Sequence, residues 1–254
     1  MRSAHSVLFE NVDASPATRD AVAAIVRDHA LDLAWLEGAG RLSDFGLLVF
    51  DMDSTLVTIE TIDEIADHCG RKAEVAAITE AAMRGEIADY TESLRRRVAL
   101  LKGVSTAALL EVWQRRMHLS PGAERLVGAA RHAGLRTLLV SGGFTFFTSR
   151  LAERLGLDFA ESNTLGFAGD QLDGQVIGPV VDGAGKARIV LETCARLGFG
   201  PERAIVMGDG ANDLPMMAVA GFSVAYRAKP AVRERASCAF DHCGLDGLLD
   251  LFPV

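Results

Sequence analysis

The 254-residue chain has an ordinary globular composition, 49% hydrophobic and 24% charged, which suffices for one large domain or a core with an insert. Its formal net charge of -8 argues against a protein that binds the phosphate backbone of nucleic acid, for which a basic patch is expected. Because no apolar run approaches the ~18 residues that span a bilayer and no secretory signal begins the chain, we expect a cytoplasmic protein with no membrane or nucleic-acid partner.

The first 40 residues carry no recognisable chemistry. Residues 6–9 favour a short strand, and Ser15-Pro16 predicts the start of a helix over residues 17–29, with Ser15 as the N-cap. We expect residues 1–40 to form an N-terminal appendage, and the sequence leaves both its role and the oligomeric state of the protein open.

The segment from Leu47 to Val57 contains the most informative pattern. Residues 47–50 are uninterrupted apolar, which is typical of a strand buried on both faces, and two carboxylates, Asp51 and Asp53, follow at once. Carboxylates are rarely left in such a place unless they are paired, hydrogen-bonded or bound to a metal. By itself the pair is equally compatible with a polar turn, so its meaning depends on the rest of the chain.

Residues 58–119 are predicted to form a small all-helical insert. Helical patterns cover about residues 61–69, 72–83, 90–101 and 106–117, with no strand signal between them. The run from Thr61 to Glu64 has the T-x-x-E form of a capping box, which places Glu60 just outside a helix N-terminus.

One arginine of this insert stands out by its position. The helix predicted from Tyr90 carries an apolar stripe that consists of Leu94, Val98 and Leu101. Arg97 falls inside this stripe, whereas Arg95 and Arg96 point away. Arg97 either covers apolar surface with its stem or faces a cleft and binds a carboxylate with two hydrogen bonds. We favour the second interpretation, with Glu60 near the mouth of the same cleft and able to bind an ammonium group.

From residue 120 onward, helices and strands alternate. Strands are predicted at 135–140, 204–207 and 222–225, helices at about 121–133, 144–155 and 187–197 and up to 217, and a hairpin near Gly169-Asp170 and Asp173-Gly174. Strands separated by helices imply an α/β fold, a doubly wound parallel sheet. We assign residues 41–57 and 120–254 to its core and residues 58–119 to a small all-helical cap domain.

Three of these strands end in the same way, apolar and then abruptly polar or glycine-rich. The ends are VFDMD at Asp51, LLVSGGF at Ser141 and AIVMGDGAND at Asp209. In an open parallel sheet such ends lie along one edge, where ligands bind. Lys186, at the start of a predicted helix, is expected to join them from a loop on that edge.

The groups expected at this edge suit a phosphoryl group. They are Asp51, Asp209, Asp213, Ser141, Gly142, Gly143 and Lys186. The carboxylates offer hard oxygen ligands for Mg²⁺, and the hydroxyl, the glycine amides and the N-terminus of the following helix form a cradle for an anion. Each feature alone is common, but their combination at successive strand ends is hard to obtain by chance.

At this point the sequence resembles the haloacid dehalogenase superfamily of phosphohydrolases, and closely resembles its phosphoserine phosphatase branch. The match runs from about Leu47 to the C-terminal region and rests on DMDSTLV, ETIDEIAD, AAMRGEI, SLRRRVALLKG, VSGGF and GDGANDLPM. The first 40 residues lie outside it.

The resemblance implies a role for each matching residue. Asp51 would be the nucleophile that forms an aspartyl-phosphate and Asp53 the general acid and base. Mg²⁺ would be the cofactor, with Asp51, the backbone carbonyl of Asp53, Asp209 and Asp213 as its site. Phosphate would be bound by Ser141, Gly142, Lys186 and Asn212. Substrate would be bound by Glu60, Arg97, Met83, Tyr90 and Gly143, where Tyr90 stands at a position often occupied by phenylalanine.

The expected activity is hydrolysis of a small molecule, O-phospho-L-serine, in the last step of L-serine biosynthesis. A related phosphatase or phosphotransferase acting on phosphothreonine or another small phosphomonoester remains an alternative. A nucleotide-binding loop at Gly185-Lys186 fails, because Val180 and Ala187 replace the first glycine and the hydroxyl of that motif. A phosphoserine-binding regulator without turnover is disfavoured by the intact aspartates at 51 and 53.

Overall fold

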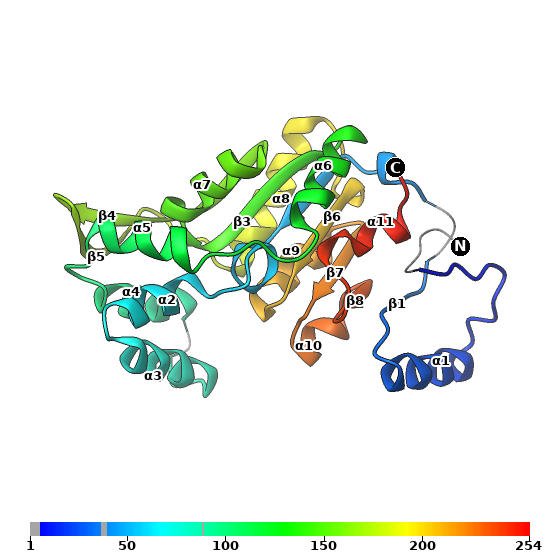
Figure 1. Ribbon diagram of the computed structural model, residues 1–254, viewed down its shortest axis with the longest axis horizontal. Coiled ribbons are helices and arrows are strands. Elements are labelled where there is room, and N and C mark those ends of the chain that lie inside the picture. Colours follow the sequence, from blue (N-terminus) through cyan, green and yellow to red (C-terminus); the bar gives the residue numbers. More distant parts are fainter. Residues whose placement is uncertain (1–5, 37–39, 88) are drawn as a thin grey trace.

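The computed structural model describes residues 6–36, 40–87 and 89–254, and its centre is an eight-stranded sheet with the order β1-β8-β7-β6-β2-β3-β4-β5 (Figure 1). The strands are β1 (Leu33–Ala34), β2 (Leu47–Phe50), β3 (Arg136–Phe144), β4 (Phe159–Ala168), β5 (Gln171–Ile177), β6 (Ala204–Gly208), β7 (Phe222–Tyr226) and β8 (Cys238–Phe240). The six strands from β8 to β4 run parallel, and β1 and β5 pair antiparallel at the two edges. The predicted α/β class is confirmed.

Helices cover both faces of the sheet. The helices are α1 (Pro16–Asp28), α2 (Thr61–His68), α3 (Lys72–Met83), α4 (Tyr90–Ala99), α5 (Thr106–Arg115), α6 (Ala123–His132), α7 (Thr145–Leu155), α8 (Gly183–Leu197), α9 (Leu214–Val219), α10 (Pro230–Arg233) and α11 (Leu248–Leu251). Leu48 and Phe50 of β2 face a core built with α6, α7 and α11, whereas Leu47 and Val49 face one built with α8, α9 and α10. Because successive strand residues point to opposite faces, all four are buried, as the sequence predicts.

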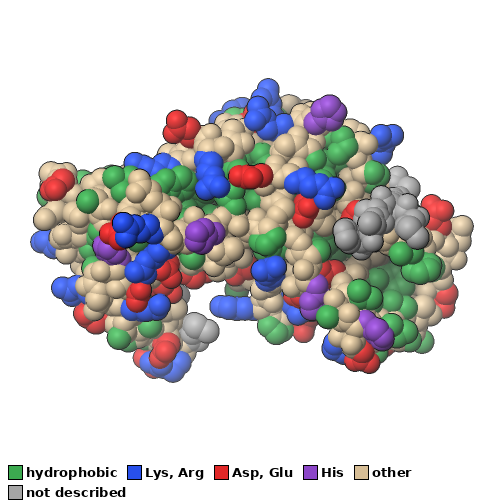
Figure 2. All heavy atoms as spheres, in the orientation of Figure 1, with side chains coloured by type: hydrophobic (Ala, Val, Ile, Leu, Met, Phe, Trp, Pro, Cys, Tyr) green, Lys and Arg blue, Asp and Glu red, His purple; other side chains and the backbone are tan. Residues whose placement is uncertain are grey.

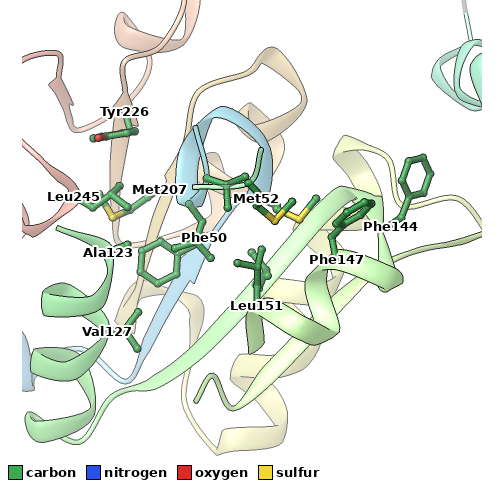
Figure 3. Close-up of a cluster of buried hydrophobic side chains, with 14 of the residues drawn as sticks. Phe50, Met52, Ala123, Val127, Phe144, Phe147, Leu151, Met207, Tyr226 and Leu245 are labelled. Carbon is green, nitrogen blue, oxygen red and sulfur yellow. The ribbon is translucent and has the colours of Figure 1, made fainter. Parts of the chain in front are cut away.

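The larger core also holds the turn that follows β2. Met52 lies fully buried beside Phe147 and Phe144, and Phe50 packs near Val127 on the other side (Figure 3). Burying a methionine side chain stabilises the fold by roughly 1.5–3 kcal/mol. Met52 therefore anchors the turn from below and leaves its two flanking carboxylates at the edge of the sheet.

Helices α2 to α5 pack together beyond the edge formed by β4 and β5 (Figure 1). The chain enters and leaves this group where Val57 and Leu119 form a β-bridge. A second attachment joins the turn after α4 to the β4–β5 hairpin, where the amide of Gly103 donates to the carbonyl of Leu172 at 2.8 Å. The group thus meets the rest of the protein at two places, and its exact limits as a cap domain stay a prediction.

Two local expectations about turns and strands are wrong. The strand expected at residues 6–9 is not formed, since residues 7–10 have no regular secondary structure and Phe9 is 74% exposed. A strand needs a neighbour for its amides and carbonyls, and local propensity does not supply one. The turn expected at Asp173-Gly174 lies inside β5; the hairpin turns at Gly169-Asp170.

The N-terminal segment is held to the sheet at its far end. Helix α1 begins at Pro16 behind the predicted N-cap Ser15, whose hydroxyl accepts the Thr18 amide at 3.4 Å, yet none of its residues is buried. Attachment comes from β1, which pairs with β8, and from Asp32, whose carboxylate accepts backbone amides of residues 241–243.

The surface carries charges of both signs. Over the face shown in Figure 2, the basic and acidic side chains of the described residues are interspersed and neither sign covers a continuous area. This matches the net charge of -8 and offers no track for a polyanion on that face. Among the described residues, no helix is long and apolar enough to cross a membrane.

Candidate active site

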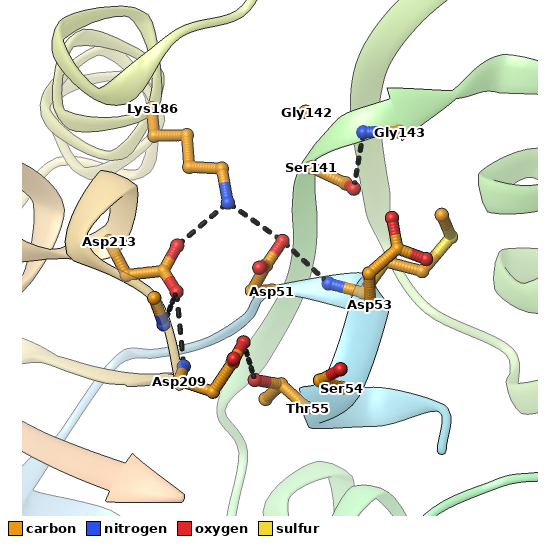
Figure 4. Close-up of polar contacts among 12 residues, drawn as sticks. Asp51, Asp53, Ser54, Thr55, Ser141, Gly142, Gly143, Lys186, Asp209 and Asp213 are labelled. Atoms are coloured by element: carbon orange, nitrogen blue, oxygen red, sulfur yellow. Dashed lines mark hydrogen bonds and ion pairs between the residues drawn. The ribbon is translucent and has the colours of Figure 1, made fainter. Parts of the chain in front are cut away.

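The three strand ends singled out in the sequence meet at one place. Strands β6, β2 and β3 are neighbours, so Asp209, Asp51 and Ser141 line the same edge of the sheet (Figure 4). The parallel register brings Phe50 level with Met207 and Leu139 on either side. The prediction that these ends converge is confirmed.

The chain leaves β2 through a tight turn over Met52–Leu56. Its Ser54 has a φ of 55°, a left-handed conformation that side chains other than glycine seldom adopt. The turn is stabilised by the Val57 amide, which donates to the carbonyl of Met52 at 3.0 Å. Within it, Oδ1 of Asp51 accepts the Met52 amide at 2.7 Å. This strained turn aims Asp51 and Asp53 away from the core, which is typical of a functional site.

Lys186 joins two of the carboxylates. Its ammonium lies 2.7 Å from Oδ1 of Asp51 and 2.7 Å from Oδ1 of Asp213, and all three side chains are buried. Burial alone lowers the pKa of Lys186, but the two carboxylates outweigh burial and raise it, so the lysine stays charged. Lys186 comes from the first turn of α8, not from a loop as expected, because Asp182 caps this helix by accepting the Gly185 amide at 2.7 Å.

One positive charge is shared here among several acids. Burial, with the neighbouring Asp213, raises the pKa of Asp51 well above its usual range despite Lys186. Burial, with Asp213 and Glu60, likewise raises the pKa of Asp209 to about 7. A further cation at this place would restore the ionised form of both carboxylates.

The donor set fits a divalent cation of the Mg²⁺ type. Among the described residues, Asp51, Asp209 and Asp213 offer carboxylate oxygens that all lie within 4.8 Å of one another. Asp213 is largely engaged, because Oδ1 accepts from Lys186 while Oδ2 accepts the amides of Asp209 and Gly210 at 3.1 and 3.0 Å. Asp51 and Asp209 are therefore the better direct ligands, with Asp213 in support.

Asp53 has an environment different from that of Asp51. Burial raises the pKa of Asp53 to about 8, with repulsion from Glu60 as the next cause, while two hydrogen bonds from Thr61 lower it. The Thr61 amide donates to Oδ1 at 3.0 Å and its hydroxyl to Oδ2 at 3.1 Å. At neutral pH Asp53 thus holds a proton and can donate it. Thr61 is the first residue of α2 and not its N-cap, which is Glu60, so the predicted capping box is wrong.

The glycine turn after Val140 lies between Asp53 and the helical group. Pairing of β3 with β4 is interrupted over residues 141–143, where the Gly143 amide donates to the Ser141 hydroxyl at 2.8 Å. This amide, expected in the anion cradle, is engaged within the turn instead. Asn163 of β4 fixes the neighbouring peptide by donating to the Gly142 carbonyl at 2.7 Å and accepting the Val181 amide at 2.8 Å.

The residues expected at the substrate end lie around the same edge. Glu60 is exposed and accepts the Ser54 hydroxyl at 2.7 Å. Arg97 is partly buried on α4, while Arg95 and Arg96 are exposed, as their spacing predicts. Met83 is the last residue of α3, and its side chain lies outside what the structure describes. Asn212 is partly buried in the turn 211–213, where its backbone carbonyl approaches Gly183 at the start of α8.

Sequence reasoning missed four residues that hold this site together. They are Ser54, Thr55, Thr61 and Asn163, and Thr55 lies buried with its hydroxyl 3.3 Å from Oδ1 of Asp209. Asn163 left a signal, a polar residue at an inward position of an alternating strand. The other three sit beside the acids, but their partners are set by tertiary contacts.

A buried lysine shared by strand-end carboxylates, on a doubly wound sheet with an inserted helical group, defines a class of phosphate-transferring hydrolases. A family model agrees, since the model of haloacid dehalogenase-like hydrolases matches residues 48–218. The chain belongs to the haloacid dehalogenase-like hydrolases.

Within that family the relatives are phosphoserine phosphatases, as the motifs predict. A phosphoserine phosphatase from Polaromonas sp. strain JS666 is 61% identical over 215 residues, which cover 83% of this chain and 91% of the relative. A solved structure described as probable phosphoserine phosphatase from Vibrio cholerae, unliganded, is 40% identical with a TM-score of 0.83, covering 94% of this chain and 73% of that one. A substrate-bound phosphoserine phosphatase complex is 36% identical with a TM-score of 0.76, covering 82% and 98%.

Proposed function

We propose that the protein hydrolyses O-phospho-L-serine to L-serine and phosphate, the last step of L-serine biosynthesis, through an aspartyl-phosphate intermediate. The observation that carries the proposal is the pair of strand-end aspartates in opposite states. Asp51 is paired with Lys186 at 2.7 Å, while Asp53 has a pKa of about 8. One acid is suited to attack phosphorus and the other to protonate the leaving alcohol.

In the first step, an oxygen of Asp51 attacks phosphorus in line as the seryl oxygen departs. Both printed contacts of the Asp51 carboxylate go to Oδ1, so Oδ2 is the oxygen that we assign to the attack. Asp53 gives its proton to the leaving oxygen. In the second step the same Asp53, now ionised, takes a proton from water as the water attacks the aspartyl-phosphate, which returns both residues to their starting states.

The phosphoryl oxygens need positive charge and hydrogen-bond donors as the bond to the leaving group breaks. Lys186 supplies a charge that is fully buried and held in place by Asp213. Ser141, Gly142 and Asn212 are the remaining groups that we assign to the phosphate. The Ser141 hydroxyl already accepts the Gly143 amide, so its proton is free to point to a phosphoryl oxygen.

We assign Mg²⁺ to the same edge. Asp51, Asp209 and the backbone carbonyl of Asp53 would hold it, with Asp213 in support, and bound Mg²⁺ would offset the repulsion between the carboxylate and the phosphoryl group. Its binding requires the carboxylates in their ionised form, which the raised pKa of Asp209 disfavours without a cation.

The amino-acid end of the substrate is assigned to the helical group. Arg97 binds the substrate carboxylate and Glu60 its ammonium, so one base and one acid match a zwitterion with a phosphate tail. Met83, Tyr90 and Gly143 complete the pocket wall. We propose residues 58–119 as the cap that sets specificity over a core of residues 41–57 and 120–254. The cytoplasmic location expected from the sequence remains a prediction.

The test is phosphate release in Mg²⁺ buffer from phospho-L-serine, phospho-D-serine, phospho-L-threonine, phosphoethanolamine and a sugar phosphate. We expect a strong preference for the two phosphoserines. Broad or sugar-directed activity would retain the aspartyl-phosphate chemistry but refute the substrate, and a preference for phosphothreonine would support the alternative phosphatase. The absence of any phosphate release would refute the proposed function.

A further inference from the structure

Tyr90 reaches from the helical group to the glycine turn of the core. It is the first residue of α4, and Asp89 caps that helix by accepting the Thr91 amide at 2.9 Å. Residues seven apart share one helix face, so Tyr90 and Arg97 point the same way, about 10 Å apart along the axis. The two side chains can therefore serve different ends of one bound molecule.

The Tyr90 hydroxyl occupies the space beside Gly142. A Cβ atom built on Gly142 would collide with this hydroxyl oxygen, so the two lie in direct contact. Asn163 holds the carbonyl of Gly142 at 2.7 Å and so keeps this peptide in place. The hydroxyl thus stands at the phosphate-binding turn and not merely near it.

This hydroxyl has no partner of its own. Within residues 6–36, 40–87 and 89–254, no hydrogen bond of the Tyr90 side chain is found, although the residue is largely enclosed. Burial raises the pKa of Tyr90, and among the charged neighbours Lys186 opposes this most, ahead of Arg97. Lys186 belongs to the phosphoryl end of the site, so the hydroxyl lies toward that end.

We propose that the Tyr90 hydroxyl donates a hydrogen bond to a phosphoryl oxygen of the substrate and is a phosphate-binding group supplied by α4. The inference rests on the proposed function for the identity of the substrate, but it applies to any phosphomonoester and to inorganic phosphate. It makes the helical group part of the phosphate site as well as of the amino-acid site. A phenylalanine at this position keeps the ring and removes only the donor.

The experiment compares Tyr90→Phe with Tyr226→Phe, because the chain contains two tyrosines and Tyr226 is buried in the core, 1% exposed. The Kd of inorganic phosphate is measured by calorimetry with Mg²⁺, and kcat/KM is measured on phospho-L-serine and on phosphoethanolamine, which lacks the carboxylate. Loss of one hydrogen bond to a charged group predicts a Kd about tenfold weaker in Tyr90→Phe. We expect a similar loss of kcat/KM on both substrates and no change in Kd in Tyr226→Phe.

A Kd for phosphate within twofold of wild type in Tyr90→Phe would overturn the inference, as would an equal weakening in Tyr226→Phe. A loss confined to phospho-L-serine would place the hydroxyl at the amino-acid end and also overturn it. If Tyr90→Phe weakens phosphate binding while the wild type fails to cleave phospho-L-serine, the proposed function fails and this inference stands. Phosphate binding thus separates the two.

Discussion

Replacing Lys186 by methionine tests the buried charge cluster at the centre of the site. The substitution keeps an unbranched side chain of similar length but removes the ammonium. In the wild type this group lies 2.7 Å from both Asp51 and Asp213, and the lysine is 0% exposed. The variant would leave two buried carboxylates side by side without their cation.

The structure indicates a large effect on stability. Removing one partner of a buried ion pair costs about 3–5 kcal/mol, because the remaining charge is neither solvated nor paired. For a chain of this size each kcal/mol lowers Tm by about 2–4 °C, so we expect a fall of roughly 6–20 °C in the absence of divalent cations. Mg²⁺ should restore more stability to Lys186→Met than to the wild type, since it would replace the missing charge next to Asp51.

The assay is thermal unfolding in chelator and again in Mg²⁺ buffer, followed by circular dichroism. Arg188→Met is the matched control, because Arg188 lies on the same helix in an exposed pair with Glu192, with side chains 61% exposed. Such surface pairs contribute 0–1 kcal/mol. The reasoning is refuted if Lys186→Met in chelator loses no more stability than Arg188→Met. Equal Mg²⁺ stabilisation of wild type and Lys186→Met would contradict the assignment of the metal to this cluster.

Three further substitutions test separate parts of the proposal. Asp51→Asn should abolish phosphate release, to below about 0.1% of wild type, with an unchanged circular dichroism spectrum; appreciable turnover would remove Asp51 as the nucleophile. Arg97→Ala should raise KM for phospho-L-serine by 10- to 100-fold and spare phosphoethanolamine, while the exposed Arg95→Ala changes neither; equal losses on both substrates would contradict the carboxylate role. Burial raises the pKa of Asp32, but backbone amides of residues 241–243 outweigh it and lower the pKa, so its stabilisation is present above pH ~4 and is lost as pH falls. Asp32→Asn should therefore lower the free energy of unfolding by about 1 kcal/mol at pH 7 in urea titrations, and less at pH 3; a loss that does not shrink at pH 3, or one matched by exposed Asp28→Asn, would contradict this.

Much of the site follows from local sequence pattern. An apolar run such as residues 47–50 has to be buried, and a carboxylate directly after it needs a compensating partner. Parallel strands place their carboxyl ends along one edge, so the meeting of Asp51, Ser141 and Asp209 follows once the strands are recognised. Helical periodicity in the same way placed Arg97 inward and its two neighbours outward.

Tertiary structure alone decided which groups pair with one another. Thr61 matches a helix cap in sequence, but its hydrogen bonds go to Asp53, a partner eight residues away that the turn after β2 brings to it. Residues 6–9 have strand propensity and form no strand, because a strand depends on a neighbour that propensity does not encode.

The sequence by itself therefore determined the family, the order of elements and the candidate chemistry, because burial and periodicity are properties of neighbouring residues. It did not determine the contact of Tyr90 with Gly142 or the bridge from Lys186 to Asp51 and Asp213. These join segments 52 and 135 residues apart, the latter counted from Asp51 to Lys186. Such distances are set by how the helical group and α8 pack on the sheet, and that packing is a property of the whole fold.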